Sequence, residues 1–150
     1  RPRPRRGTSG GARGLRYLFD TDTLSELLRR APSPALLRRL AATALDDQAT
    51  SSITLGELLY GAHRLRERAT DLVERIEQTL LPNLAVLPFD ADAARAYGAL
   101  RAELEREGTP IGDADMRIAS IALDHDLVVV TGNVRHFERV PDLSVENWLV

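Results

Sequence analysis

The sequence predicts one α/β domain, a three-layer α/β/α sandwich around a central, mainly parallel sheet of four to five strands. Two observations favour this class. From residue 17 onward, short apolar runs alternate with segments of helical periodicity, and strands separated by helices are joined by right-handed crossovers that make them parallel. The chain of 150 residues, 43% of them hydrophobic, is long enough for one core and too short for two independent ones.

Short apolar runs bounded by polar or turn-forming residues supply the strands. Tyr17, Leu18 and Phe19 suit a buried strand, because aromatic and branched side chains pack well on a pleated surface. The expected strands are residues 17–19, 49–53, 84–87 and 127–130, with a short fifth strand at 143–145.

Helices are expected between these strands, each with its own start or stop signal. Leu24, Leu27 and Leu28 lie on one face of a first helix that begins near Leu24. Ser33 and Pro34 give the second helix an N-cap followed by proline at its first position. The later helices are expected from 34 to about 45, from 54, from after 63 to 82, from 90 to 108 and from 113 to about 124.

Composition excludes several classes of chemistry. The chain has no cysteine, which rules out a disulfide scaffold, a thiolate zinc site and a cysteine nucleophile. All 20 basic residues are arginine, so no mechanism that needs a lysine is available. No run approaches the ~20 apolar residues of a membrane span, and the N-terminus lacks an apolar signal segment. We therefore expect a cytoplasmic protein without a membrane anchor.

The charge is unevenly distributed. Residues 1–14 are rich in Arg, Gly and Pro and are expected to be a disordered tail, with the folded domain at 15–150. Residues 1–16 carry six arginines and no acid, so the rest holds 14 arginines against 22 acids, a balance of −8. The tail either is simply solvated or contacts RNA phosphates. An acidic domain that handles an anionic substrate needs a metal ion, local basic patches or a basic partner.

Polar groups follow several of the predicted strands. Asp20 follows the first strand, and Asn133 follows the fourth strand. Glu57 is expected in the first turn of the helix after the second strand. Asp113 and Asp115 begin the helix before the fourth strand. In a parallel sheet these side chains gather at one edge, where ligands bind. Carboxylates so close together repel one another. A set of ligands that are all oxygen atoms suits Mg²⁺ or Mn²⁺. This set predicts metal-dependent phosphodiester hydrolysis.

Each of these acids also has a purely structural interpretation. Thr54 and Glu57 fit a capping box, in which the glutamate bonds back to the start of its own helix. Asp113 is a candidate N-cap, and Asp22 is a candidate partner for the dipole of the first helix. Only their joint position on one sheet edge favours the functional interpretation.

The remaining basic groups carry weaker signals. The three histidines have no metal-ligand spacing and are expected to be solvated or satisfied within the fold: His63, His125 and His136. Three arginines form either an exposed helix end or a contact with substrate phosphates: Arg64, Arg66 and Arg68.

Four segments, in this order along the chain, resemble the PIN-domain ribonucleases and most closely the VapC-type toxins of bacterial toxin–antitoxin pairs. They are residues 17–26, 51–61, 110–119 and 128–137, and residues 145–148 look like the end of such toxins. The resemblance implies a PIN-like fold and gives Asp20, Glu57 and Asp115 the places of the acids that bind Mg²⁺ or Mn²⁺. It also implies an endoribonuclease that cuts tRNA or rRNA, forms a homodimer or a larger assembly and is inhibited by a cognate antitoxin.

After the three acids at 20, 57 and 115, the family has a fourth site position, and there this chain departs from the family pattern. Many PIN domains carry an acid where this chain has Asn133, and relatives with asparagine there often have aspartate where this chain has His136. An amide ligates through its carbonyl oxygen or orients a water, but it brings no charge. Metal binding is then expected to be weaker unless Asp113 or Asp22 compensates.

Two other functions fit parts of the sequence. The run Asp20-Thr21-Asp22-Thr23 after an apolar strand resembles the nucleophile motif of haloacid-dehalogenase-like phosphatases, although those enzymes usually need a lysine that is absent here. A non-catalytic PIN-like binding module, with Asn133 as a sign of lost activity, is the second alternative.

Overall fold

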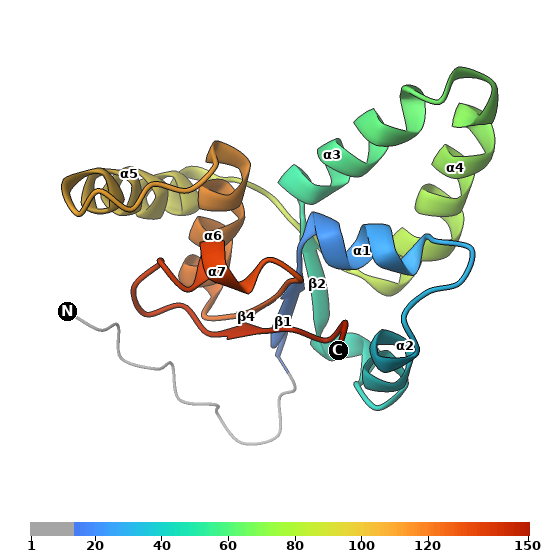
Figure 1. The fold of residues 1–150 in the computed structure, drawn as a ribbon, viewed down its shortest axis with the longest axis horizontal. Coiled ribbons are helices and arrows are strands. Elements are labelled where there is room, and N and C mark those ends of the chain that lie inside the picture. Colours follow the sequence, from blue (N-terminus) through green and yellow to red (C-terminus); the bar gives the residue numbers. More distant parts are fainter. Residues whose placement is uncertain (1–13) are drawn as a thin grey trace.

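The computed structural model describes residues 14–150, so the predicted tail, apart from Gly14, lies outside the described residues. Within the described residues, five parallel strands form one sheet in the order β3-β2-β1-β4-β5 (Figure 1). The strands are β1 Tyr17–Phe19, β2 Gln48–Ser51, β3 Ala85–Leu87, β4 Val128–Val130 and β5 Val145–Glu146. The predicted three-layer α/β fold is confirmed.

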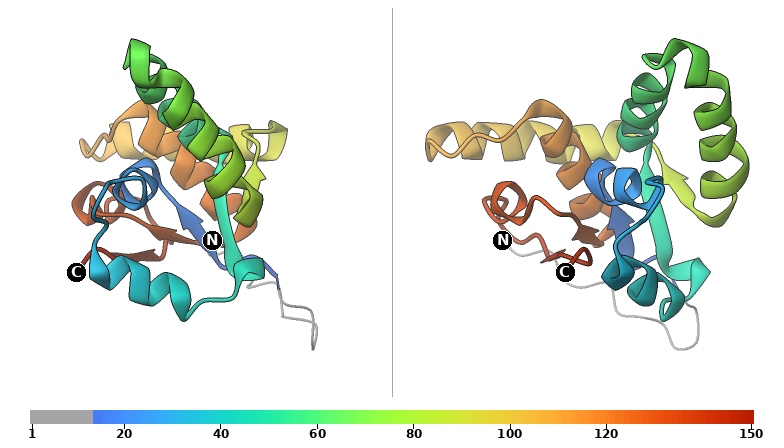
Figure 2. Two further views of the ribbon diagram at one scale, coloured as in Figure 1. Left: turned by 90° about the vertical axis from the view of Figure 1, so that its right-hand side faces the viewer. Right: turned by 45° about the vertical axis from the view of Figure 1, so that its right-hand side comes forward.

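Helices cover both faces of the sheet (Figures 1 and 2). The α-helices are α1 Thr21–Leu27, α2 Pro34–Ala41, α3 Ser52–His63, α4 Ala69–Arg75, α5 Ala91–Arg106, α6 Asp113–His125 and α7 Val134–Phe137. Shorter helical turns are η1 Leu45–Asp47, η2 Arg66–Arg68, η3 Ile76–Leu80 and η4 Leu81–Asn83. The helices α3 and α4 form a hairpin that projects beyond the sheet, at the upper right of Figure 1.

The alternation of side chains along β1 and β4 creates two separate cores. Leu18 and Val129 face a cluster built with α5, α6 and α7, while Phe19 and Val130 face a cluster built with α1, α2, α3 and the segment after α4. Successive residues of a strand point to opposite faces, so each central strand contributes to both cores. Burial of a leucine or phenylalanine side chain contributes about 1.5–3 kcal/mol. This double packing fixes the central strands and therefore the edge where they end.

Two helices begin at residues other than the sequence predicted, and α6 begins where predicted but with a different cap. The first helix begins at Thr21 rather than near Leu24, because the side chain of Asp20 caps it. The third begins at Ser52, with Ser51 as its N-cap, so the expected start at Thr54 was wrong. The N-cap of α6 is Gly112, which makes no side-chain capping bond. The capping interpretations of Thr54 and of Asp113 are therefore both wrong.

Other boundaries also shift. The helix expected to reach residue 45 ends at Ala41, and Leu45–Asp47 forms a separate turn before β2. The second strand ends at Ser51 rather than at residue 53. The fifth strand is Val145–Glu146, two residues later than the expected start, and pairs in parallel with β4. No helix in residues 14–150 is long and apolar enough to cross a membrane.

Candidate active site

Asp20 lies at the carboxyl end of β1, where the strand passes directly into α1. Its backbone N–H donates to the carbonyl of Val130 on β4 at 3.1 Å, which extends the β1–β4 pairing by one residue. Its Oδ1 accepts the backbone N–H of Thr23 at 2.9 Å. The Thr23 hydroxyl in turn donates to the carbonyl of Val130 at 2.9 Å. Strand pairing and helix capping together hold this carboxylate in place.

The carboxyl group of Asp20 is almost inaccessible, with 3% of the residue exposed. Burial raises its pKa to about 6 because the charged form loses its hydration, and the negative charge of Asp22 adds to the rise. Hydrogen bonds from the Thr131 hydroxyl and the Thr23 backbone counteract part of this effect. A nearby cation would stabilise the charged form of Asp20 and so offset the rise in its pKa.

Glu57 approaches the same edge from α3. It lies in the second turn of that helix, since the helix begins at Ser52, and the Thr21 hydroxyl donates to its Oε1 at 2.6 Å. The same hydroxyl lies 3.3 Å from the hydroxyl of Thr54. Glu57 thus contacts the first residue of α1 instead of bonding back to the start of its own helix.

Asp115 lies in the first turn of α6 and is partly buried. Burial is the largest cause of its raised pKa, and the charges of Glu57 and Asp22 raise the pKa further. His136 acts in the opposite direction, with its Nδ1 3.4 Å from Asp115 Oδ2. The negative charges of Asp22, Glu57 and Asp115 are therefore close enough to interact at the carboxyl edge of the sheet.

Asn133 and His136 contact each other beside Asp115. The side-chain nitrogen of Asn133 lies 2.8 Å from His136 Nδ1, and the Asn133 backbone N–H donates to the Thr131 hydroxyl at 2.9 Å. His136 was predicted to be solvated or satisfied within the fold. His136 is satisfied within the fold, but its partners are two candidate site residues, Asn133 and Asp115. Its spacing of three residues from Asn133 was the sequence signal that could have placed it in the site.

The two acids proposed to compensate for Asn133 occupy different surroundings. Asp22 raises the pKa of both Asp20 and Asp115, so its charge acts on the site. Asp113 instead accepts hydrogen bonds from the Tyr97 hydroxyl and, at 2.8 Å, from Arg117 Nε, and these bonds lower its pKa. Asp113 is thus engaged by α5 and by its own helix, which leaves Asp22 as the acid able to add charge at the site.

The donor set fits a hard divalent ion in chemical type. The candidate ligands are carboxylate and amide oxygens, and the shifted pKa values of Asp20 and Asp115 have causes that a bound cation would offset. Within residues 14–150, however, no three acidic or histidine side chains are close enough as placed to hold one ion together. Glu57 is engaged by Thr21 and Asp115 by His136, so ion binding requires these carboxylates to exchange partners.

Comparisons with known proteins identify the family. The model of the PIN domain matches residues 17–143. A tRNA(fMet)-specific endonuclease VapC of Salmonella typhimurium is 37% identical, covering 89% of this chain and 98% of the relative. Ribonuclease VapC2 of Haemophilus influenzae is 35% identical over 90% of this chain and 99% of the relative, and toxin FitB of Neisseria gonorrhoeae is 36% identical over 80% and 89%.

Solved structures agree with the sequence relatives. DNA-bound VapBC of Salmonella typhimurium superposes with a TM-score of 0.83 at 37% identity, covering 89% of this chain and 98% of that chain. FitAcB of Neisseria gonorrhoeae gives 0.81 at 35% identity, covering 87% and 96%. These matches decide against the haloacid-dehalogenase-like phosphatase. The chain belongs to the PIN-domain VapC family, the ribonuclease toxins of bacterial toxin–antitoxin systems.

Proposed function

We propose that residues 15–150 form a Mg²⁺-dependent endoribonuclease, with Mn²⁺ as an alternative ion, in which Asp20, Glu57 and Asp115 hold the metal. The proposal is carried by one observation, the convergence of Asp22 of α1 and Glu57 of α3 on Asp115 of α6, whose pKa their charges raise. A divalent ion bound there would lower the pKa of a water molecule and neutralise charge on the scissile phosphate.

The residues of the chain itself have distinct proposed roles. Asp20 presents a carboxylate fixed by the strand and by the cap of α1, so it needs little reorganisation when an ion binds. Thr21 holds Glu57 toward α1, and His136 holds Asp115 toward Asn133. We assign to Asn133 a carbonyl oxygen that ligates the ion or orients a water molecule. Asp22 supplies negative charge to the site, which partly replaces the missing fourth acid.

The proposed substrate is structured RNA, either tRNA or rRNA, in the cytoplasm. The relatives from Salmonella typhimurium and Shigella flexneri are tRNA(fMet)-specific endonucleases, which makes that tRNA the first candidate. Protein freed of its antitoxin should cut an RNA of this kind with Mg²⁺ or Mn²⁺ and stop when EDTA is added. Sequencing the new 5′ ends after induced expression identifies the target.

The same experiment tests the non-catalytic alternative. Asp20→Asn and Asp115→Asn should abolish cutting while the protein remains folded. RNA pools that stay intact with the unaltered protein under all metal conditions would establish a binding module instead.

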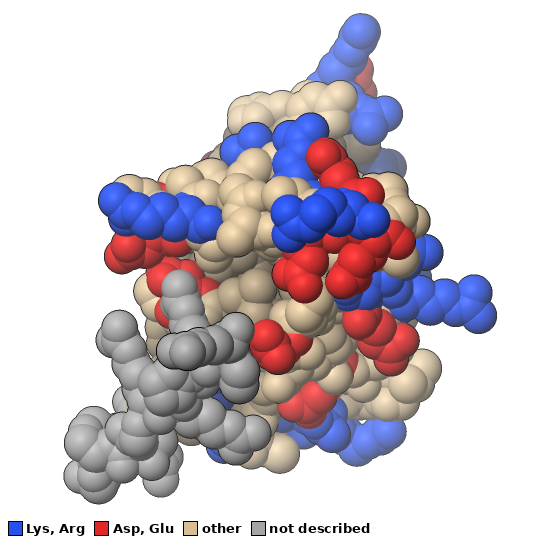
Figure 3. Space-filling view, turned by 90° about the vertical axis from the view of Figure 1, so that its left-hand side faces the viewer, with Lys and Arg blue, Asp and Glu red and all other residues tan. Residues whose placement is uncertain are grey.

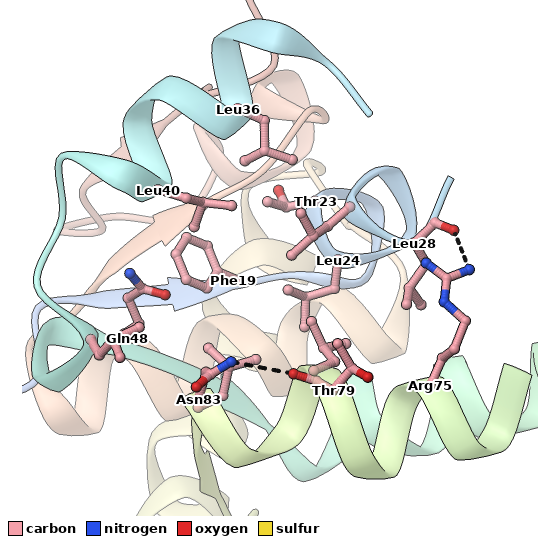
Figure 4. Close-up of a pocket in the computed structure, with 14 residues that line it drawn as sticks. Phe19, Thr23, Leu24, Leu28, Leu36, Leu40, Gln48, Arg75, Thr79 and Asn83 are labelled. Carbon is pink, nitrogen blue, oxygen red and sulfur yellow. Dashed lines mark hydrogen bonds between the residues drawn. The ribbon is translucent and has the colours of Figure 1, made fainter. Parts of the chain in front are cut away.

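We propose a cognate antitoxin as the protein partner and a homodimer, or a larger toxin–antitoxin assembly, as the working form. Support comes from relatives solved as VapBC and FitAB complexes. An apolar cavity of about 330 Å³ lies between α1, α2 and the segment after α4, with Leu24, Leu36 and Leu40 among its lining (Figure 4). We assign this cavity to apolar side chains of the antitoxin. Copurification of the toxin with its antitoxin tests the proposed partner, and light scattering of the complex tests the proposed assembly.

A further inference from the structure

Tyr60 on α3 is the one exposed aromatic side chain among the described residues, with 66% of its surface accessible. The other aromatic rings are buried or partly buried, and most of them contact another ring. A single exposed apolar residue is common and needs no explanation by itself. What distinguishes Tyr60 is the set of side chains around it.

Tyr60 belongs to a stripe of side chains that leads away from the candidate active site. Glu57, Tyr60 and Arg64 are spaced i, i+3 and i+7, which brings them to one face of α3 and its C-cap. The guanidinium of Arg64 lies over the Tyr60 ring, 5.6 Å from its centroid. A rise of about 1.5 Å per residue separates Glu57 from Arg64 by about 10 Å along the helix. The stripe therefore runs from the acids to the tip of the α3–α4 hairpin.

The tip of the hairpin carries three arginines and one acid, Glu67, so its charge balance is positive. Within the described part of the chain, no ion pair joins Arg64, Arg66 or Arg68 to a carboxylate, and all three are exposed. Arg101 and Arg117, on α5 and α6, are instead paired with Glu105 and Asp113. The face on that side of the molecule shows arginines and acids intermixed (Figure 3). Positive charge is thus available at the hairpin tip and is neutralised on the α5–α6 side.

We propose that Tyr60 and Arg64 bind the single-stranded stretch of RNA beside the cleaved bond, with a base stacked on the Tyr60 ring and a neighbouring phosphate held by Arg64. This inference rests on the proposed ribonuclease function. Proteins recognise unstacked bases by aromatic stacking and track the backbone with cations. Arg64, which contacts Tyr60 on this face, is positively charged and exposed, which suits a polyanion better than an apolar protein surface.

Binding of a fluorescein-labelled single-stranded RNA of mixed sequence to the full chain, measured by anisotropy in EDTA, separates binding from cutting. Tyr60→Ala should weaken binding about fivefold to a hundredfold, the range found for loss of one stacked base, while Tyr60→Phe and Tyr60→Trp retain it. Arg64→Ala should weaken binding and reduce the dependence of log affinity on log salt by about one unit. Leu37→Ala on α2 and Arg95→Ala on α5 are matched exposed controls and should leave affinity unchanged.

Three results would overturn the proposal. The first is unchanged RNA affinity in both Tyr60→Ala and Arg64→Ala. The second is a loss in Tyr60→Phe as large as in Tyr60→Ala, because stacking does not need the hydroxyl. The third is a loss of antitoxin inhibition in these variants with RNA affinity intact, which would assign the stripe to the protein partner. Failure of the unaltered protein to cut RNA with Mg²⁺ would refute the proposed function separately, because binding is measured without metal.

Discussion

The carboxyl edge of the sheet and the α3–α4 hairpin differ in what holds their functional side chains. At the edge, Asp20 is buried and fixed by strand pairing and by its capping bond to Thr23. On the hairpin, Tyr60 and Arg64 are exposed, and the Arg64 guanidinium lies over the Tyr60 ring. The comparison suggests a division of work: the sheet edge holds the reacting groups in place, and the hairpin presents adaptable side chains for recognition.

The largest effect should come from removing a charge at the edge. Asp115→Asn should lower the rate of RNA cleavage by about three orders of magnitude or more, since metal-based charge stabilisation contributes several kcal/mol to the transition state. Single-turnover cleavage with Mg²⁺ measures this. Leu37→Ala, an exposed change on α2, is the control for handling and folding. An Asp115→Asn protein that cuts RNA at the unaltered rate would remove Asp115 from the site.

Two positions in α3 should differ in how much their side chains contribute to the free energy of unfolding. Leu58→Ala removes a buried side chain from the core and should cost about 2–5 kcal/mol of unfolding free energy. Tyr60→Ala, two residues later and exposed, should change it by less than about 0.5 kcal/mol. Urea denaturation followed by circular dichroism measures both. Equal losses in the two variants would mean that Tyr60 packs against the fold, contrary to its exposure.

Asp20 should reduce the stability of the metal-free protein near neutral pH. Its folded pKa of about 6 lies above the 3.8 of an ordinary aspartate, so the folded state holds the proton more tightly. Stability is then lost as pH rises from about 4 to about 6, and the loss is complete above that range. Asparagine can still cap α1 and cannot ionise. Asp20→Asn should therefore raise the unfolding free energy by about 2–3 kcal/mol at about pH 7.5 and by little at about pH 4, measured in EDTA.

The unfolding free energies of the unaltered protein and of Asp20→Asn can differ or agree across this pH range, and each outcome has its own meaning. Equal stability of the two proteins across this pH range would mean that the carboxyl group is hydrated in solution. A gain in stability together with lost cleavage would mark Asp20 as a residue kept for function at a cost in stability.

The smallest effect concerns His136, which contacts Asp115 and Asn133. Groups that orient a ligating carboxylate typically change metal affinity by about 10–100-fold. His136→Ala should accordingly weaken Mn²⁺ binding by about tenfold in titration calorimetry. His125→Ala, at the other end of α6, is the matched control because that histidine also lies beside a carboxylate. Unchanged Mn²⁺ affinity in His136→Ala would leave His136 as a structural contact only.

Much of the fold followed from local patterns. Tyr17–Phe19 and the valines of β4 were predicted as strands because apolar and branched runs suit buried parallel strands. The start of α3 was less predictable, because Ser51 and Thr54 are both acceptable caps and only packing decides which one is used. The capping box at Thr54 failed for this reason.

The amino-acid sequence by itself determined the order of strands and helices, the absence of cysteine and lysine chemistry, and the family that the later comparisons established. It could not decide the partners of each acid. Asp22 acts on the site and Asp113 does not, because Arg117 pairs with Asp113 within α6 and Tyr97 of α5 reaches it once α5 packs against α6. Contacts between groups far apart in sequence depend on how the helices pack on the sheet, and a local pattern carries no information about that packing.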